Sequence, residues 1–470
     1  MFKKFKNPYL GLIVGFLAAL VLLSFAPSNK IIFLIFIALG SYLFYLLKDL
    51  KKTAFLLYLF FLPFERGATF SLPMVENVSF WITFTFADLS FFFLLFILFR
   101  ERIVKKKKYK FNFSKSDWWL VLFLIFAFIP IFFTSFWQVS FLAFLRLLRA
   151  VSVFVFIPLI FQKEKQKFIN FILLTLGASL IFQGVWSVLQ FALRSPLGRT
   201  IEQIGQKFSP YGHIAFEELS FFRSQGTFVH PNTLASFVGI LIPMFFLLIL
   251  SRYKNKMMDL IYSLAFVFGS IALVLSASRA AWGVVSIILL IEFLFLFLKF
   301  KNKIVLEMKR FIWIFILLVV FLPLLIIPRF SHLSSSFQEY GSGNYRLGLI
   351  QKSVALSKKY PLGIGLENFP VVLVTEFSSS KFSSDPVPPH NIFAKVLAET
   401  GILGFLSFLF FLVYKYKEFF LKLRTNKNLY KIGFLFASLA FLGLASFYPL
   451  FSAANIFDYF WLFLALYSLS

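Results

Sequence analysis

Apolar runs of about 20 residues recur along the whole chain and constrain its fold more than any other feature. An α-helix needs about 20 predominantly apolar residues to cross a hydrocarbon core roughly 30 Å thick. The runs are continuous and do not alternate with polar residues, which disfavours a transmembrane barrel. Hydrophobic residues make up 60% of the 470 residues and charged residues 14%, against about a quarter charged in soluble domains. The sequence therefore predicts an all-α integral membrane protein.

Hydropathy predicts a bundle of about 12 to 14 transmembrane helices. The predicted helices span residues 9–25, 31–47, 53–64, 80–99, 117–136, 149–162, 168–193, 232–250, 258–277, 280–298, 311–329, 390–414, 432–453 and 457–469. The first follows a basic start but has no clean cleavage site, so we expect it to be retained as a helix. The chain contains no cysteine, which excludes disulfides and thiolate metal sites.

The predicted helices and the segments between them divide the chain into five regions. These are N-terminal transmembrane helices (1–193), a first long outer loop (194–231), central transmembrane helices (232–329), a large outer loop (330–389) and C-terminal transmembrane helices (390–470). Loops this long are seldom simple turns and often carry function.

The positive charge of the chain predicts its orientation in the membrane. The formal net charge is +27, and with a cytoplasmic N-terminus most of the 47 lysines and arginines fall in inner segments, with the largest block at Arg100–Lys110. This asymmetry follows the positive-inside rule and places both termini in the cytoplasm. The basic charge therefore indicates orientation and contact with membrane lipid, and we expect no nucleic-acid partner.

The four histidines lie on the predicted outer side or at its boundary, which predicts that any chemistry faces away from the cytoplasm. They are His213, His230, His332 and His390. His390 is the candidate catalytic base, because a histidine near its reference pKa of about 6.5 accepts protons at neutral pH. The alternative is a hydrogen-bonded structural histidine.

The large outer loop is predicted to contain an amphipathic helix over about 345–360, ended by a proline and the glycines after it. Leu347, Ile350 and Val354 would share one face of this helix. That face could lie on the bilayer surface or on the membrane bundle.

Three arginines on the outer side are candidate ligands for a polyanion. They are Arg223, Arg279 and Arg346, each near the mouth of a predicted helix. A guanidinium is planar, stays charged and can bind two phosphate oxygens at once. The alternatives are a snorkelling arginine at Arg279 and a solvated charge at Arg346.

Polar residues next to these candidates are predicted to contact substrate. His230 and Asn232 follow Arg223, and Asn391 follows His390. Asn391 could donate a hydrogen bond to a sugar hydroxyl, although capping of the following helix is the alternative.

Charged residues inside predicted helices require partners, because each lone charge costs about 3 kcal/mol or more in lipid. Lys395 and Glu399 are four residues apart and are predicted to be a mutually neutralising, mainly structural pair. Asp88 and Glu292 have no partner that the sequence identifies.

Metal catalysis is poorly supported by the sequence. The outer acidic residues are scattered, and His213 with Glu217, although at i,i+4 spacing, gives only two ligands. We therefore predict no metal site and no cofactor.

Four segments together resemble the O-antigen ligase and O-antigen polymerase family of bacterial envelope proteins. In chain order they are GTFVHPNTLASFVGI, SASRAAWG, YRLGLIQKSVALSKKYPLGIGLENF and PPHNIFAKVLAETGILG, and they lie within about 200–404. Each segment alone is a weak signal, but the ordered set is fairly specific.

The resemblance implies a helical-bundle glycosyltransferase in the bacterial cytoplasmic membrane. Such an enzyme moves a glycan from a polyprenyl-pyrophosphate carrier to an acceptor hydroxyl on a glycan or lipid, on the outer side, without metal and with inversion. The family's pyrophosphate-binding arginines would correspond to Arg279 and Arg346 and its base to His390. The sequence does not separate ligase from polymerase. A transporter or flippase of lipid-linked saccharides is the alternative, although related halves, which such proteins often show, are not evident.

Overall fold

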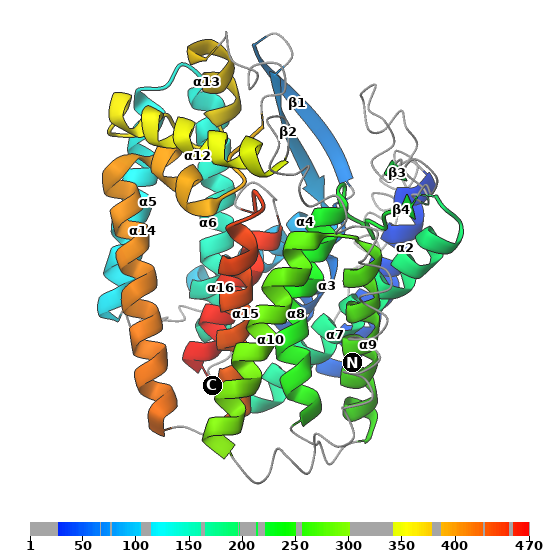
Figure 1. Cartoon of the computed structure of the whole chain (residues 1–470). Coiled ribbons are helices and arrows are strands. Elements are labelled where there is room, and N and C mark those ends of the chain that lie inside the picture. The colour runs from blue at the N-terminus through cyan, green and yellow to red at the C-terminus, as the bar shows by residue number, and fades with distance from the viewer. Residues whose placement is uncertain are drawn as a thin grey trace.

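The structure is a computed structural model of the chain, and Figure 1 shows its arrangement. The residues that the structure describes are 27–65, 67–75, 78–104, 114–160, 165–195, 197, 213–214, 221–250, 256–300, 342–377, 387–425, 428–450 and 455–469. His332 and the predicted helices 9–25 and 311–329 lie outside these residues.

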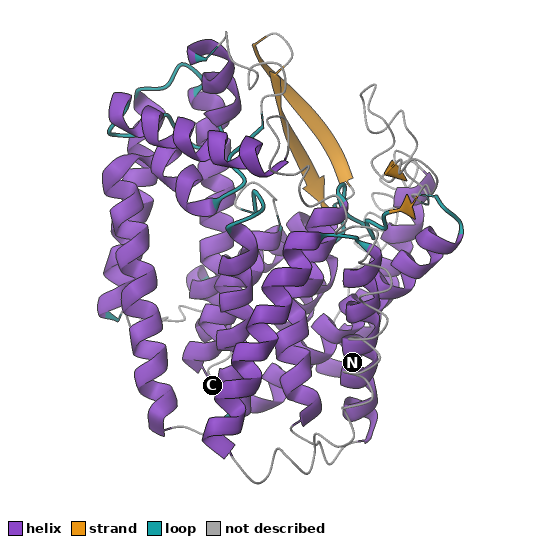
Figure 2. Ribbon diagram, in the orientation of Figure 1, coloured by secondary structure: helices purple, strands orange, loops and turns teal. Residues whose placement is uncertain are grey.

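The described residues form mainly long helices that run side by side, which confirms the predicted all-α membrane fold (Figure 2). The helices are α2 (Pro27–Leu47), α3 (Leu50–Phe61), α4 (Phe86–Ile103), α5 (Lys115–Phe128), the short 3-10 helix η2 (Ile129–Phe132), α6 (Trp137–Ile160), α7 (Lys165–Ala192), α8 (Pro231–Leu250), α9 (Lys256–Leu275), α10 (Arg279–Phe300), α12 (Ser342–Lys359), α13 (Phe369–Glu376), α14 (Ile392–Thr425), α15 (Leu429–Ala445) and α16 (Ile456–Leu469).

Seven helical segments among the described residues are long and apolar enough to cross a membrane. They are α5 with η2, α6, α7, α8, α9, α10 and α14, and the shorter apolar helices α2, α15 and α16 accompany them. The central element is α8, which packs against α9, α10 and α15. Within its most apolar stretch, 78% of the residues are buried. A helix that is apolar on all sides is typical of a buried or membrane-spanning position, because it has no polar face for water.

Local sequence determines where several of these helices begin. Thr85 and Asp88 form a capping box at the start of α4, and Ser114 and Asp117 do the same for α5. Asn428 caps α15 by accepting a hydrogen bond from the backbone of Tyr430. Each cap satisfies N–H groups that the first helical turn leaves without a partner.

A β-hairpin replaces the first part of one predicted helix. Strands β1 (Gly67–Val75) and β2 (Val78–Thr85) pair antiparallel, so the prediction of helix from residue 80 was wrong up to Thr85. The β2 sequence VSFWITFT is rich in aromatic and β-branched residues, which favour strands. Hydropathy counts these residues as apolar in either conformation. The Arg146 guanidinium lies 5.0 Å from the ring centre of Phe80, so this contact holds β2 against α6.

Helix α6 begins earlier in the structure than in the prediction, because its arginines interrupt the apolar run on which the prediction relied. The predicted helix started at residue 149, whereas α6 starts at Trp137 and includes Arg146 and Arg149. Charged residues end an apolar run in a hydropathy profile, but they remain compatible with a helix whose interior supplies partners.

Helix α12 lies across one end of the bundle, with α13 beyond it, at the same end as the hairpin (Figure 1). Helix α12 confirms the predicted loop helix, and with α13 it forms a second small apolar core on α14. This core consists of Leu349, Leu356, Ile364, Phe369, Leu373 and Ala398. The face predicted from Leu347 and Val354 is not the one packed on the bundle, because these residues are 54% and 40% exposed.

The loop after α12 inserts its backbone into a break in α14. Gly401 interrupts the helix with a φ of 74°, and Gly363 in the loop has a φ of 96°. The loop N–H groups of Ile364 and Gly365 donate to the carbonyls of Ala398 and Glu399 at 3.0 Å each, and Ile402 N–H donates to the Pro361 carbonyl at 3.0 Å. A Cβ at Gly363 would lie 2.5 Å from the Glu399 carbonyl, so only glycine allows this approach. The Pro-Leu-Gly-Ile-Gly segment thus joins α12 to α14.

Candidate functional site

The predicted arginines and histidines come together at the end of the bundle that α12 covers. His230 directly precedes α8, Arg279 begins α10, Arg346 lies in the first turns of α12, and His390 lies two residues before α14. Arg223 lies on the segment leading into α8. We call these five residues the arginine–histidine cluster.

The segment before α8 is fixed to α7 by hydrogen bonds from two glutamines of that helix. Gln183 of α7 accepts a hydrogen bond from Thr227 N–H at 2.9 Å and donates to its hydroxyl at 2.6 Å. Gln190 accepts from Gly226 N–H at 2.8 Å and donates to the Gly226 carbonyl at 2.8 Å. Glycine is required at position 226, because its φ is 61° and a Cβ there would clash with the side-chain oxygen of Gln183. These hydrogen bonds fix the positions of Arg223 and His230 next to the start of α8.

Arg223 links this segment to the turn before α10. Its Nε donates to the Ser276 carbonyl at 2.8 Å, and one terminal nitrogen donates to the Asn232 side-chain oxygen at 2.8 Å. The Asn232 backbone N–H in turn donates to His230 Nδ1 at 3.0 Å. His230, Asn232 and Arg223 therefore form one hydrogen-bonded unit, which the sequence did not predict.

Tyr448 lies beside Arg346 and also contacts the residue before Arg279. Its ring centre lies 5.9 Å from the Arg346 guanidinium carbon, and its hydroxyl hydrogen-bonds with Ser278, the residue before Arg279. Burial and the positive charge of Arg279 both lower the pKa of Arg346. Sequence inspection missed Tyr448, because it follows α15 in a stretch that reads only as apolar.

His390 is held in its neutral form. Burial, and then the positive charge of Arg346, lower its pKa from 6.5 to about 4. His230 is similar: burial, then Arg223 and His390, lower its pKa to about 4. His390 Nδ1 is buried and has no hydrogen-bond partner among the described residues. A neutral imidazole carries a lone pair that can accept a proton at pH 7.

Asn391 is a helix cap. Its side-chain oxygen accepts from Ala394 N–H at 3.0 Å, and its side-chain nitrogen donates to the Ser446 carbonyl at 3.2 Å. Both amide groups therefore contact protein, which corresponds to the capping alternative.

Lys395 has two acidic neighbours. Its ammonium lies 3.5 Å from Glu399, which confirms the predicted pair, and 2.9 Å from Glu367, which the sequence did not indicate. Glu367 has a φ of 62°, so the loop backbone is shaped to bring its carboxylate to Lys395. The lysine ties the loop to α14 just below His390.

A second polar group lies inside the bundle and gives Asp88 the partner that the sequence did not identify. Arg149 of α6 forms ion pairs with Asp88 of α4 and, at 3.0 Å, with Asp458 of α16. It also donates to the Asn455 side chain at 2.9 Å, and Tyr58 of α3 donates to Asp458. We call these five residues the Arg149 cluster.

Glu292 is not given a partner in this way. Both of its carboxylate oxygens are buried without a hydrogen-bond partner among the described residues.

No group of three or more His, Asp or Glu residues that could hold a metal ion occurs within the described part of the chain. Of the pair that the sequence analysis judged insufficient for a metal site, His213 lies in strand β3 (His213–Ile214) and Glu217 is outside the described residues.

Comparison with known protein families provides the context for this geometry. Residues 264–409 match the family model described as O-antigen ligase. This region is similar to O-antigen ligases. The match includes Arg279, Arg346 and His390 and confirms the predicted resemblance, over a shorter stretch than the predicted 200–404. None of the curated proteins matches the chain. The protein is thus a multi-pass membrane protein of glycan-processing type.

Proposed function

We propose that the protein transfers a glycan from a polyprenyl-pyrophosphate carrier to an acceptor hydroxyl. The observation that supports this most directly is the position of a neutral histidine beside Arg346, with Arg279 close to that arginine. In this proposal Arg279, Arg346 and Arg223 bind pyrophosphate, and His390 is the catalytic base. His230 and Asn232 contact substrate, and Asn391 supports His390 as a cap.

The reaction follows from the charges. His390 accepts the proton of the acceptor hydroxyl as its oxygen attacks the anomeric carbon, and the bond from that carbon to the pyrophosphate oxygen breaks. Attack opposite the leaving group inverts the anomeric configuration. The pyrophosphate gains negative charge as the bond breaks, so fixed guanidinium groups stabilise the transition state more than the ground state. Arginines in this role substitute for a divalent cation, and the proposed reaction needs no metal.

The site is proposed to face outward from the bacterial cytoplasmic membrane. Four basic residues support this orientation: Lys51, Lys52, Arg100 and Lys422 lie at helix ends far from the arginine–histidine cluster. The opposite ends of α3 and α4 lead to the hairpin, and α14 starts at Ile392, two residues after His390. An excess of basic residues at one set of helix ends is typical of the cytoplasmic side. The division into N-terminal, central and C-terminal helices with two outer loops is part of this proposal.

Reconstitution tests the proposal. The full chain in liposomes is supplied with a polyprenyl-pyrophosphate glycan and a candidate acceptor, and products are sized by gel electrophoresis and mass spectrometry. We expect transfer that persists in EDTA and is lost in Arg279→Ala. Donor binding without transfer under all acceptor conditions would contradict the enzyme and favour a transporter. Loss of transfer in EDTA with recovery on adding a divalent ion would contradict metal independence.

A further inference from the structure

The first part of α14 carries His390 and is separated from the rest of that helix. Gly401 has a φ of 74° and a ψ of −177°, so the helix is broken after Thr400. Residues 392–400 therefore form a piece of about two and a half turns, at 3.6 residues per turn. A helical piece this short is oriented by the groups that hold it, and these groups also determine where His390 lies.

The loop beside this piece is anchored to α6 and to the turn before it. Ser140 of α6 donates to the Leu366 carbonyl at 3.1 Å. The Asn368 side-chain nitrogen donates to the hydroxyls of Ser140, at 3.1 Å, and of Thr134. Glu367 lies between the two anchored loop residues and has a φ of 62°, which costs energy for a residue with a Cβ and persists only where the surroundings hold it. The position of Glu367 is therefore fixed relative to α6.

An ion pair connects this anchor to the first part of α14. The buried Lys395 ammonium donates to Glu367 at 2.9 Å and lies 3.5 Å from Glu399. Glu399 belongs to the same helical piece, so it balances the lysine charge but cannot orient the piece. The main-chain hydrogen bonds from the loop end at Ala398 and Glu399, near the break, whereas Lys395 lies only five residues after His390. The pair with Glu367 thus holds the piece nearer to the histidine.

We propose that Lys395 and Glu367 are positioning residues for His390. Their ion pair aligns the first part of α14 on the loop that α6 anchors, and so it determines the position of His390 beside Arg346. This inference rests on the proposed function for the catalytic role of His390. The positioning itself can be measured without glycan transfer.

Glu367→Gln tests the proposal because it breaks the ion pair while Lys395 keeps Glu399 as its counter-ion. Thermal unfolding of the full-length protein in detergent should be close to that of the unmodified protein. We expect kcat for transfer to fall by about 10–100-fold with little change in KM, since a displacement of about 1 Å in an active site can cost about 10²-fold.

A second measurement needs no transfer activity. Diethyl pyrocarbonate modifies neutral imidazoles, and mass spectrometry of peptides gives the rate of modification of each histidine. In Glu367→Gln, His390 should react several-fold faster relative to His230, because the segment that carries His230 is fixed to α7 and not to the loop. A general loosening of the fold would raise both rates together.

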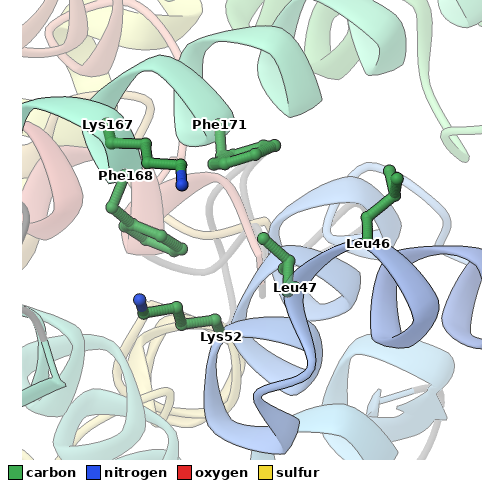
Figure 3. Close-up of a pocket in the computed structure, with 6 residues that line it drawn as sticks. All are labelled: Leu46, Leu47, Lys52, Lys167, Phe168 and Phe171. Carbon is green, nitrogen blue, oxygen red and sulfur yellow. The ribbon is translucent and has the colours of Figure 1, made fainter.

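Three variants serve as matched controls. Glu399→Gln removes the other carboxylate from Lys395, and Glu376→Gln breaks an exposed ion pair with Lys359 that does not involve α14. Lys167→Gln removes a charge from a pocket of about 190 Å³ between α2, α3 and the start of α7 (Figure 3), at the end of α7 opposite the glutamines that hold the segment before α8. All three should leave kcat and the ratio of histidine modification near the unmodified values.

Lys395→Gln/Glu399→Gln breaks the same tie from the other side. It leaves Glu367, whose side chain is 15% exposed, as the remaining charge of the three, and it should reproduce both effects. The proposal is overturned if the ratio is unchanged in both tie-breaking variants, if His390 and His230 react faster together, or if Glu399→Gln lowers kcat as much as Glu367→Gln. A raised ratio in a protein that transfers no glycan would contradict the proposed function and still support the positioning.

Discussion

Two groups of charged residues in this protein differ in the sign of the charges that surround each cation. In the Arg149 cluster one guanidinium is balanced by the carboxylates of Asp88 and Asp458 inside the bundle. In the arginine–histidine cluster the charges that lower the pKa of Arg346 and His390 are other cations, Arg279 and Arg346 respectively. The first group joins four helices, and the second lies at helix mouths.

The difference shows how charge balance separates structural from functional ions. Removing one partner of a buried, balanced group leaves an uncompensated charge and destabilises the fold. Burial and then the charge of Arg279 lower the pKa of Arg346, which means that they disfavour its charged form, so an anionic ligand beside Arg346 would be stabilising. We therefore expect changes in the Arg149 cluster to reduce stability and changes in the arginine–histidine cluster to reduce activity.

The largest expected effect is on catalysis. His390→Ala should lower kcat for glycan transfer by about 10²–10⁴-fold, because it removes the proposed base. Thermal unfolding in detergent should be nearly unchanged. The control is Lys358→Ala, an exposed residue of α12. Activity within a few-fold of the unmodified protein would remove His390 from the mechanism.

The next largest effect is expected on the stability of the protein, from a change in the Arg149 cluster. Arg149→Met should lower the free energy of unfolding by about 3–5 kcal/mol, because Asp88 and Asp458 are left buried without their cation. Stability is measured by denaturant titration of the purified protein. Adding Asp88→Asn and Asp458→Asn should recover part of the loss. If Arg149→Met were as stable as the unmodified protein but inactive, the cluster would be functional and the comparison would fail.

A smaller effect is expected at Tyr448. Tyr448→Phe keeps the ring beside Arg346 and removes the hydrogen bond to Ser278, so kcat/KM should fall about tenfold, the equivalent of one hydrogen bond. Tyr416→Phe is the matched control, since it removes a tyrosine–serine hydrogen bond of 3.0 Å between α14 and α15. Equal kinetic losses in both variants would indicate general packing rather than positioning of arginines.

The smallest effect is expected from pH. With the pKa of His390 lowered to about 4, the base is neutral above that pH, so kcat/KM should stay constant from pH 8 to pH 5 and fall as pH drops through about 4. An ordinary histidine would show the fall near 6.5. Arg346→Gln removes a neighbouring positive charge and should move the inflection upward. An inflection near 6.5 in the unmodified protein would contradict a buried base beside Arg346.

Sequence reasoning succeeded where one residue type carries the signal by itself. Long apolar runs predicted the membrane helices, and the arginines and histidines that we selected do meet at one end of the bundle. Helix mouths at the same side of a membrane lie near each other, so residues far apart in sequence could be grouped by predicted sidedness alone. Their roles in transfer remain predictions.

The features that sequence reasoning missed depend on contacts between distant segments. Asp88 and Arg149 are 61 positions apart and Tyr448 and Ser278 are 170 apart, and no local pattern pairs them. The strand β2 was read as helix because hydropathy does not distinguish conformations. The start of α6 was displaced for a related reason: Arg146 lowers the hydropathy of the segment before the predicted start at residue 149, although that segment is helical.

The insertion of the Gly363 loop into the break at Gly401 has a consequence for tolerance to mutation. Main-chain hydrogen bonds between the loop and α14 set the spacing between Arg346 and His390: Ile364 and Gly365 donate to α14 carbonyls, and the Pro361 carbonyl accepts from Ile402. These bonds do not depend on the identity of the side chains. Side chains on the exposed face of α12 can therefore diverge without altering that spacing, provided the two glycines are kept. This backbone joint therefore fixes the geometry of the site and leaves the exposed surface of α12 free to vary.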